Sequence, residues 1–428
     1  MFKRKSWYRR KKYAHFDDRL SAKAAQAYVA DPTNVVRHAF YPFIEFDILT
    51  RRYRTNRELD SSGKTVKRRK LLSPKKRPIK LSAHKDGYIY SFYARKLSDL
   101  YELYVKGEAF SKAVIAYRPG MGTNFSNAVD AFNFIKSTDA SKVITLDISS
   151  FFENLDHRKL KDKWIEVLGG SKLPLDHYKI FRSLTKYCTV RIEDICEEFD
   201  LTEKEITKGL VERICSSKDF RVRVKGLTPK IIEVHSIDYG IPQGSAMSAI
   251  LSNIYMLDFD REVYALCQKH GIFYRRYCDD VIFVQPLDDK IDILNEARKI
   301  LENNGARLLI HQDKTWGHIF NGERVEGKPV EYLGLVFDGE KVLIRNGSLA
   351  KYHRKLRVAV AYRKSLAQTR QGKFAGKVFL RSLYKRYSWK MSQLSFHGYA
   401  RRVDNSTDLS GVRRQLRKSQ VQLERLLE

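Results

Sequence analysis

Apolar runs separated by polar turns dominate the middle of this chain and predict a sheet flanked by helices. Residues 143–146 and 281–284 are apolar runs of strand length, and each adjoins an acidic residue. Short runs of this kind, bounded by turn residues, are typical of buried strands. Helical spacing of apolar residues appears near residues 92–105 and 127–135, and again from residue 245 toward Gly271. The pattern therefore predicts an α+β fold.

The most informative stretch is Tyr277-Cys278-Asp279-Asp280, which lies between the apolar runs 272–274 and 281–284. This pattern predicts a β-hairpin with the two acids at its turn. Burying adjacent carboxylates is costly unless a cation compensates them, and Mg²⁺ prefers one or two carboxylates together with substrate phosphates. An exposed Asp-Asp turn explains the same residues equally well, so this stretch alone does not decide between the two.

Three further segments favour the metal site. Asp147 ends the run 143–146 and is followed by a turn and a helical pattern through Trp164. Pro242-Gln243-Gly244 precedes a long helical pattern, and a helix N-terminus suits a base or a phosphate. Residues 311–315 come next, followed by an apolar run at 330–337 that predicts one strand.

In this order and spacing, the segments resemble the palm motifs of reverse transcriptases. Asp147 matches the first catalytic acid of that family, and Tyr277-Cys278-Asp279-Asp280 matches its YxDD box. Pro242-Gln243-Gly244 matches the PQG turn, Lys314-Thr315 a later motif, and Tyr332-Leu333-Gly334 the primer grip. Two weaker matches lie earlier in the chain. Arg77-Pro78-Ile79 resembles the triphosphate-contacting strand of the family, and residues 116–120 resemble its second block. The resemblance extends from about Arg77 to Phe337.

This resemblance implies a right-hand polymerase fold with fingers, a palm of antiparallel sheet flanked by helices, and a basic helical thumb. The expected boundaries are a basic N-terminal extension at 1–40, fingers at 41–140, a palm at 141–340 with a helical insertion near 174–237, and a thumb with a C-terminal RNA-binding region at 341–428. Strands are expected at 43–49 and 79–81. An acidic cluster in the insertion is interpreted as a solvated helix face, because no histidine accompanies it: Glu193, Asp194, Glu197 and Glu198. Rings interleaved with basic residues are expected to build the core of the thumb: Tyr352, Tyr362, Phe374, Phe379, Tyr384, Tyr387 and Trp389.

The resemblance also implies a catalytic centre with two Mg²⁺ ions, for which Mn²⁺ is a possible substitute. Asp147 and Asp279 would hold the metals, with the main-chain carbonyl of Ile148 completing the shell and Asp280 supporting the site from beside Asp279. Two such metals activate the attacking hydroxyl and clamp the triphosphate. Lys314 would act on the leaving pyrophosphate, although an ordinary surface lysine is the simpler interpretation of that residue.

Six residues are expected to contact the incoming nucleotide: Arg77, Ser150, Phe151, Phe152, Gln243 and Gly244. Arg77 would neutralise the γ-phosphate, and the N–H groups of Ser150 and Phe151 would face phosphate oxygens. Phe152 lies five residues past Asp147, the steric-gate position of the family, where a bulky ring excludes a 2′-hydroxyl and selects DNA synthesis. Core packing beside Phe151 is the alternative role of this ring. Gln243 and Gly244 would border the nascent base pair.

Charge supports a polyanionic partner. The chain of 428 residues carries a net charge of +31. Residues 1–12 contribute +7, residues 51–80 contribute +11 and residues 345–428 contribute +17, so the remaining residues are close to neutral at −4. Solubility alone is better served by added acids than by added bases. The basic excess therefore indicates nucleic-acid contact at both ends of the catalytic core.

The cysteines and the hydropathy exclude other classes. Five cysteines show no CxxC spacing, so no zinc site is indicated: Cys188, Cys196, Cys215, Cys267 and Cys278. Isolated thiols fit a reducing compartment. No run approaches 18 apolar residues, and the first residues lack the apolar core of a signal peptide. The expectation is a cytoplasmic protein without a membrane partner.

The wording of the motifs narrows the resemblance further. Residues 146–157, the Tyr277-Cys278-Asp279-Asp280 box and residues 83–94 resemble prokaryotic reverse transcriptases of the abortive-infection and defence-associated branch, most of all its class 2 members. That resemblance implies a structured non-coding RNA as template and scaffold, dNTPs as substrates, a cDNA product and a role against phage. No nuclease, integrase or RNase H domain is expected after the thumb.

Two other functions remain open from the sequence. A template-independent terminal nucleotidyltransferase would use the same acids. A catalytically idle RNA-binding scaffold is disfavoured, because it need not keep Asp147, Asp279 and Asp280.

Overall fold

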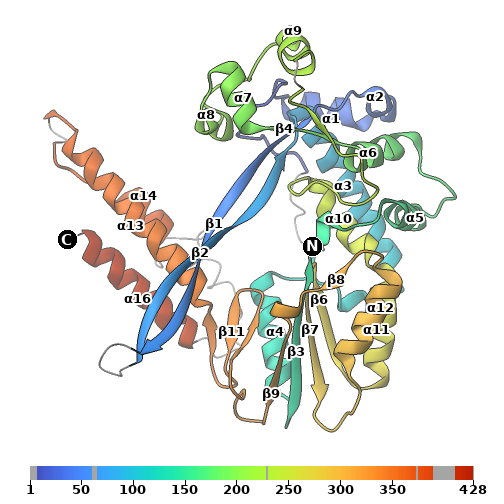
Figure 1. The fold of residues 1–428 in the computed structure, drawn as a ribbon, viewed down its shortest axis with the longest axis vertical. Helices are drawn as coiled ribbons and strands as arrows, with labels where there is room; N and C mark the ends of the chain where they lie inside the picture. Colours follow the sequence, from blue (N-terminus) through green and yellow to red (C-terminus); the bar gives the residue numbers. More distant parts are fainter. Residues whose placement is uncertain (1–6, 60–64, 228–229, 373–374, 389–409, 428) are drawn as a thin grey trace. The chain divides into compact units, whose positions relative to one another are not determined.

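The computed structural model describes residues 7–59, 65–227, 230–372, 375–388 and 410–427. The chain divides into two compact units, each built from segments distant in sequence (Figure 1). The first unit comprises Met1–Gly107, Ser150–Leu257 and Gly305–Leu308, and the second comprises Glu108–Ser149, Asp258–Asn304 and Leu309–Glu428.

A five-stranded antiparallel sheet forms the centre of the second unit. Its strands are β3 (Ser141–Ser149), β6 (Phe273–Tyr277), β7 (Asp280–Pro286), β8 (Leu309–Ile310) and β9 (Trp316–Phe320). β7 pairs with β6 on one side and with β3 on the other, while β8 and β9 pair with the opposite edge of β3. Most of β3 is buried, as expected for a central strand with both faces covered. The predicted strand before Asp147 and the predicted hairpin are both confirmed.

Helices and a smaller sheet complete the second unit. The elements are η1 (Ala109–Lys112), α4 (Asn124–Lys136), α11 (Leu257–Lys269, whose first residue belongs to the first unit), α12 (Ile293–Asn304), η4 (Gln312–Lys314), β10 (Val330–Tyr332), β11 (Leu335–Phe337), β12 (Val342–Ile344), α13 (Asn346–Gln368), α14 (Arg381–Tyr387) and α16 (Ser410–Leu427). The apolar face of α4 packs with β3, β7, β10 to β12 and α16 in one buried cluster.

The prediction of a single strand at 330–337 is wrong, because the structure has two strands there, β10 and β11. Leu333 and Gly334 both adopt the left-handed conformation, with φ of 47° and 87°, and reverse the chain between β10 and β11. Leucine rarely adopts this conformation, so the sequence did not signal the turn.

The C-terminal helices partly match the expected aromatic core. Tyr352 and Tyr387 are buried with Leu356, Val360 and Leu423, and Tyr384 packs against them. In contrast, the rings of Tyr362 and Phe379 are exposed. Phe374 and Trp389 lie outside the described residues.

The first unit is mainly helical. Its elements are α1 (Ala22–Ala30), α2 (Pro32–Arg37), β1 (Phe43–Leu59), β2 (Thr65–Leu81), α3 (His84–Val105), η2 (Phe151–Glu153), α5 (His157–Leu168), α6 (Leu175–Thr185), β4 (Cys188–Arg191), α7 (Ile192–Phe199), α8 (Glu203–Lys208), α9 (Ser217–Asp219), η3 (Phe220–Lys225), β5 (Glu233–Val234) and α10 (Ala246–Tyr255). The predicted strands at 43–49 and 79–81 are the inner ends of much longer strands, which Figure 1 draws as a twisted ribbon.

The insertion near 174–237, which lies between the Asp147 segment and the Pro-Gln-Gly turn, is mostly helical, as predicted. It also supplies two strands. β4 pairs in parallel with the start of β1, and β5 continues the same four-stranded sheet. On α7, Ile192 and Ile195 are buried while Glu193 is exposed, so the acidic residues lie on the solvated side of that helix.

The continuous helix predicted from residue 245 toward Gly271 is two helices, α10 and α11. The N–H of Met256 bonds to the carbonyls of Asn253 and Ile254, which ends α10 one residue before α11 begins. Neither proline nor glycine marks this break. Within the described residues, no helix is both long enough and apolar enough to cross a membrane.

Candidate active site

Asp147 and Asp280 are direct cross-strand partners on the neighbouring strands β3 and β7. Their main chains are fixed by the sheet: Ile148 N–H donates to the Asp279 carbonyl at 3.0 Å, and His311 N–H donates to the Asp147 carbonyl at 2.8 Å. Three acidic residues predicted from two separate motifs therefore meet at one end of one sheet.

The turn that carries Asp279 is a two-residue hairpin between Tyr277 and Asp280. Cys278 adopts a φ of 59°, the left-handed conformation that short hairpin turns require. The fully buried Arg276 fixes this turn. Its guanidinium donates to the Cys278 carbonyl at 3.0 Å and to both oxygens of the buried Asp260 on α11, at 2.7 and 2.5 Å.

Sequence reasoning missed the Arg276–Asp260 pair. Arg276 occupies one of the two inward positions of β6, whose side chains alternate between half-buried and buried. An arginine at such a position is a recognisable signal, because a buried charge requires a partner.

Tyr117, from the segment 116–120, lies beside the same turn. Its ring centroid is 6.0 Å from that of Tyr277, and its φ is 59°. The segment is tied to β6, because Ile115 N–H donates to the Arg276 carbonyl at 3.0 Å and Arg276 N–H donates to the Ala113 carbonyl at 2.9 Å. Tyr117 therefore lies beside the turn that carries the acids.

The carboxylates of this site repel one another. Burial, followed by the charges of Asp279 and Asp147, raises the pKa of Asp280 from 3.8 to about 7. Burial raises the pKa of Asp279 as well, and the charge of Asp147 adds to this effect. The site therefore favours a positive charge placed among the three acids.

Lys314 supplies part of that charge. Its ammonium lies 2.5 Å from Oδ1 of Asp147. Its positive charge offsets part of the rise in the pKa of Asp279 and Asp280. The side chain remains 44% exposed. The structure therefore places Lys314 in the carboxylate cluster.

The donor set fits a divalent cation that also binds a substrate. Among the described residues, no group of three or more His, Cys, Asp and Glu side chains is arranged as a complete metal site. Mg²⁺, however, needs only one or two carboxylates when phosphates and water complete its shell. Burial and the neighbouring carboxylates raise the pKa values of Asp279 and Asp280, so a cation held among these acids would stabilise their charged forms.

In the first unit, the segment after β3 is held by the Pro-Gln-Gly turn. Ile241 N–H donates to the Phe152 carbonyl at 2.9 Å. Ser150 has a φ of 43°, Phe151 is buried, and the half-buried ring of Phe152 contacts that of Phe151 edge-on, with centroids 5.4 Å apart. Of the two phenylalanines, only Phe152 leaves part of its ring accessible.

The turn itself touches β2. Lys80 N–H donates to the Gln243 carbonyl at 3.1 Å. Gly244 has a φ of 110°, and a Cβ on it would lie 2.9 Å from the Lys80 carbonyl, so no other residue fits here without strain. Arg77 is exposed on β2, three residues before Lys80.

A cavity of about 360 Å³ joins these elements within the first unit. It is lined by residues of β2, of the Ser150 segment, of the insertion and of the Pro-Gln-Gly turn, among them Lys80, Ser150, Tyr187, His235 and Gln243. Ser150 and Gln243, predicted from separate motifs, therefore line one cavity.

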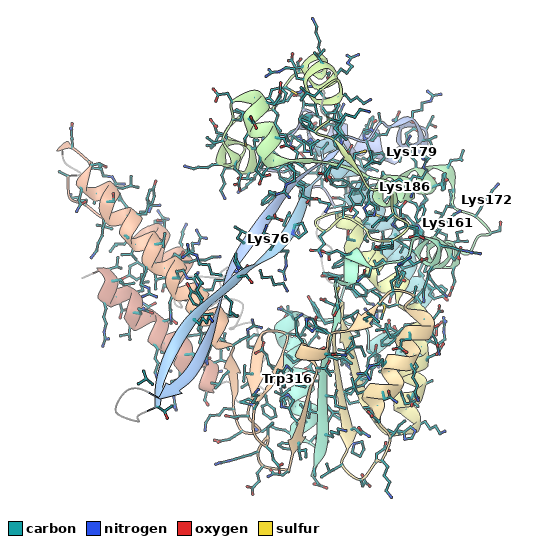
Figure 2. All side chains as sticks on the ribbon, in the orientation of Figure 1. Lys76, Lys161, Lys172, Lys179, Lys186 and Trp316 are labelled. Carbon is teal, nitrogen blue, oxygen red and sulfur yellow. The ribbon has the colours of Figure 1, made fainter. Side chains whose placement is uncertain are left out.

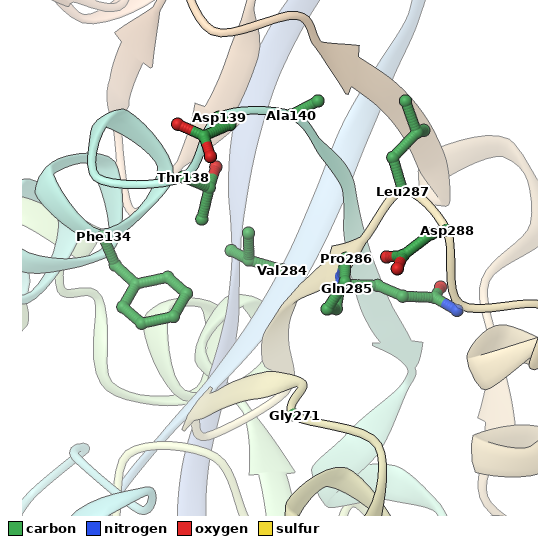
Figure 3. A pocket seen from close by; sticks show the side chains of 10 residues that line it. All are labelled: Phe134, Thr138, Asp139, Ala140, Gly271, Val284, Gln285, Pro286, Leu287 and Asp288. Atoms are coloured by element: carbon green, nitrogen blue, oxygen red, sulfur yellow. The ribbon is translucent and has the colours of Figure 1, made fainter.

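A second cavity, of about 380 Å³, lies in the other unit and is largely apolar (Figure 3). Its walls include Phe134, Val284, Pro286 and Leu287. Val284 and Pro286 lie toward the end of β7 that is far from Asp280. This cavity is therefore separate from the carboxylates of Asp147, Asp279 and Asp280.

Comparison with known proteins identifies the class. A family model described as "Reverse transcriptase (RNA-dependent DNA polymerase)" matches residues 73–337, more than half of the chain. The retron Ec83 reverse transcriptase of Escherichia coli is 32% identical over 73 residues, which cover 17% of this chain and 23% of that protein.

Among solved structures, apo telomerase from Candida tropicalis, truncated from its C-terminal domain, is 13% identical with a TM-score of 0.43, and the match covers 64% of this chain and 53% of that chain. Telomerase from Candida albicans with a fragment of telomeric RNA is 10% identical with a TM-score of 0.41, covering 97% and 68%. At these TM-scores the neighbours add nothing to the assignment. The chain matches about a quarter of the curated relative and about half of the first telomerase.

The family match spans the strands that carry Asp147, Asp279 and Asp280, and it covers the Pro-Gln-Gly turn. The chain belongs to the reverse transcriptase family. Its fold is the right-hand polymerase fold of mixed helices and sheets, as the sequence predicted.

Proposed function

We propose that this protein is an RNA-directed DNA polymerase that works by two-metal nucleotidyl transfer. The observation that carries the proposal is the cross-strand pairing of Asp147 with Asp280, with Asp279 at the adjoining turn, in a chain of the reverse transcriptase family. Burial of Asp280, followed by repulsion from Asp279 and Asp147, raises the pKa of its carboxyl, and this supports a cation among the three acids.

Asp147 and Asp279 would hold the divalent ions, with the main-chain carbonyl of Ile148 as a further ligand and Asp280 supporting the site from beside Asp279. When bound, such ions lower the pKa of a primer 3′-hydroxyl and neutralise the triphosphate. Arg276 holds the Asp279 turn in place through the Cys278 carbonyl. Lys314, drawn toward the site by Asp147, would stabilise the leaving pyrophosphate.

The first unit would bind the nucleotide. Arg77 would pair with the γ-phosphate, while the N–H groups of Ser150 and Phe151 would donate to phosphate oxygens. The partly exposed ring of Phe152 would meet the 2′-position of the sugar, which favours dNTPs over rNTPs. Gln243 and Gly244 would border the base pair, and the contact of Gly244 with the Lys80 carbonyl supports a fixed position of this turn against β2.

The template would be a dedicated, structured non-coding RNA, and the cDNA would act in defence against phage. The net charge of +31 supports a large polyanionic partner. The likeness of a short segment to a bacterial retron reverse transcriptase agrees with a prokaryotic setting, and the proposed location is the cytoplasm. Phage should form few plaques on cells that carry the wild-type gene. On cells that carry the Asp279→Ala variant, phage should form as many plaques as on cells without the gene.

The polymerase proposal is tested by offering purified protein dNTPs and Mg²⁺ with and without a primed RNA of known sequence. Sequencing the products distinguishes copying from untemplated addition. Products complementary to the RNA, absent when RNA is omitted, support the proposal. Extension of equal length and random sequence without RNA would instead establish terminal transfer.

A further inference from the structure

The ribbon formed by β1 and β2 leaves the protein core soon after it begins. β4 pairs only with Phe43, Ile44 and Glu45, and within the described residues no third strand continues beside the ribbon. Burial falls accordingly: Ile44 is 0% exposed and Ile48 is 47% exposed. The two strands nevertheless stay paired as far as Leu59 and Thr65.

The outer part of this ribbon, residues 51–59 and 65–76, is here called the ribbon arm. It carries ten Lys and Arg residues and one acid, a net charge of +9. Two pairs of basic residues stand directly opposite one another in the register, Arg54 opposite Lys70 and Arg57 opposite Lys67. Like charges in such pairs are destabilising, and an isolated two-stranded hairpin is at best marginally stable in water.

Protection against edge-to-edge aggregation does not explain this charge. One or a few charged residues blunt an edge strand. The arm has ten, and it also exposes apolar side chains, among them Leu71, which is 60% exposed and lies opposite Tyr53. Basic residues interleaved with exposed apolar and aromatic groups suit a ligand with phosphates, sugars and base faces.

We propose that the ribbon arm binds the phosphate backbone of structured RNA. The proposal rests on the function proposed above, because it assumes an RNA partner. The shorter strand of the arm, residues 51–59, extends about 30 Å at about 3.3 Å per residue. This length is enough to follow several phosphates of one duplex. The major groove of A-form RNA is too narrow and deep to read, so the arm recognises backbone and shape rather than sequence.

The base of the ribbon links this arm to the candidate site of the first unit. Beyond the arm, β2 continues through Arg77 to Lys80, whose N–H donates to the Gln243 carbonyl at 3.1 Å. The ion pair between Lys80 and Glu45, at 2.8 Å, holds the two strands together at the same level. RNA bound to the arm is therefore connected through one strand to the turn that would border the base pair.

The test compares two triple variants with equal loss of charge. The arm variant is Lys70→Gln, Lys75→Gln and Lys76→Gln. The control is Lys161→Gln, Lys172→Gln and Lys179→Gln, which lie on or between α5 and α6 of the same unit; Figure 2 shows Lys76 on the ribbon and these three lysines away from it. Binding of a fluorescent RNA hairpin is measured between about 50 and 200 mM salt.

Each lost phosphate contact should reduce the slope of log affinity against log salt by about 0.9. The arm variant should therefore lose two to three units of slope and bind at least about tenfold more weakly at low salt, whereas the control should stay close to wild type. Equal effects of the two triples would overturn the proposal, because the charge would then act without regard to place.

A second variant replaces residues 51–74 by Asn-Gly, which joins Thr50 to its cross-strand partner Lys75 through a short hairpin turn. It should keep the melting temperature of the wild type and lose at least as much RNA affinity as the arm variant, because it removes more basic residues. Wild-type affinity in this variant would refute the arm as an RNA site. Reduced binding to anionic lipid vesicles with unchanged RNA binding would also refute it and assign the arm to a membrane surface.

Extension of a short oligo(dT) primer on poly(rA) separates this proposal from the function it rests on. The arm variants should retain extension at saturating template, because Asp147, Asp279 and Asp280 are unchanged. Failure of the wild-type protein to extend any primer would refute the proposed function, whereas normal extension with equal RNA affinities in all variants would refute the arm alone.

Discussion

Replacing Asp280 by asparagine should stabilise the metal-free protein, and the gain should grow with pH. Burial and the charges of Asp279 and Asp147 raise the pKa of this carboxyl from 3.8 to about 7. The folded protein therefore holds a proton that the unfolded chain has lost between these two values. Stability that is fully present below about pH 4 is lost as the pH rises toward 7.

The magnitude follows from the two pKa values. One pKa unit corresponds to about 1.4 kcal/mol, so ionised Asp280 destabilises the fold by up to ~4 kcal/mol above pH 7. At pH 5 only ~1.5 kcal/mol of this cost has appeared. Asparagine has nearly the same shape and no charge. The stability gained by Asp280→Asn should therefore increase by about 2–3 kcal/mol between pH 5 and pH 8.

Urea unfolding of both proteins in EDTA at pH 5 and pH 8 measures this difference. Asp288→Asn, an exposed acid beyond the other end of β7, is the matched control and should show no such pH dependence. Added Mg²⁺ should stabilise the wild type more than Asp280→Asn at pH 8, because the cation offsets repulsion that the variant lacks. An equal change in stability at both pH values would refute the electrostatic reasoning.

Three further substitutions test separate parts of the account. Phe152→Ala should raise the use of rNTPs relative to dNTPs in primer extension, because space opens at the 2′-position; an unchanged ratio in an active variant would leave Phe152 a packing residue. Gly244→Ala should lower the melting temperature by the equivalent of about 1–3 kcal/mol, since its Cβ would lie 2.9 Å from the Lys80 carbonyl at a φ of 110°. A wild-type melting temperature would contradict that geometry. Arg276→Met should cost about 3–5 kcal/mol in urea unfolding, because the buried charge of Asp260 loses its cationic partner and keeps only the hydrogen bond from the Tyr274 hydroxyl; a loss below about 1 kcal/mol would argue against the buried pair.

The parts of the site that the sequence predicted are those with a local pattern. The apolar run before Asp147 and the hairpin around Cys278-Asp279 have strand-length runs and a tight turn, and both strands form as expected. That the two strands are neighbours came from the resemblance to a family rather than from periodicity. No pattern within either segment encodes its partner.

What the sequence did not predict depends on tertiary contacts. The break at Met256 and the reversal at Leu333 occur at residues that commonly continue a helix or a strand. The partner of Arg276 lies sixteen residues earlier in the chain, on a helix. The outer half of the ribbon has basic residues where strands usually alternate apolar and polar ones. Its strand conformation could therefore not be predicted from the pattern of hydrophobic residues.

The most direct test of the central claim is primer extension by a variant with Asp279→Ala and Asp280→Ala, measured together with RNA binding. We predict that dNTP incorporation is abolished, that the melting temperature does not fall below that of the wild type because buried, mutually repelling charges are removed, and that RNA affinity stays close to that of the wild type because the basic regions proposed to bind RNA are unchanged. Near-normal extension on primed RNA by this double variant would contradict the assignment of the catalytic metals to these acids.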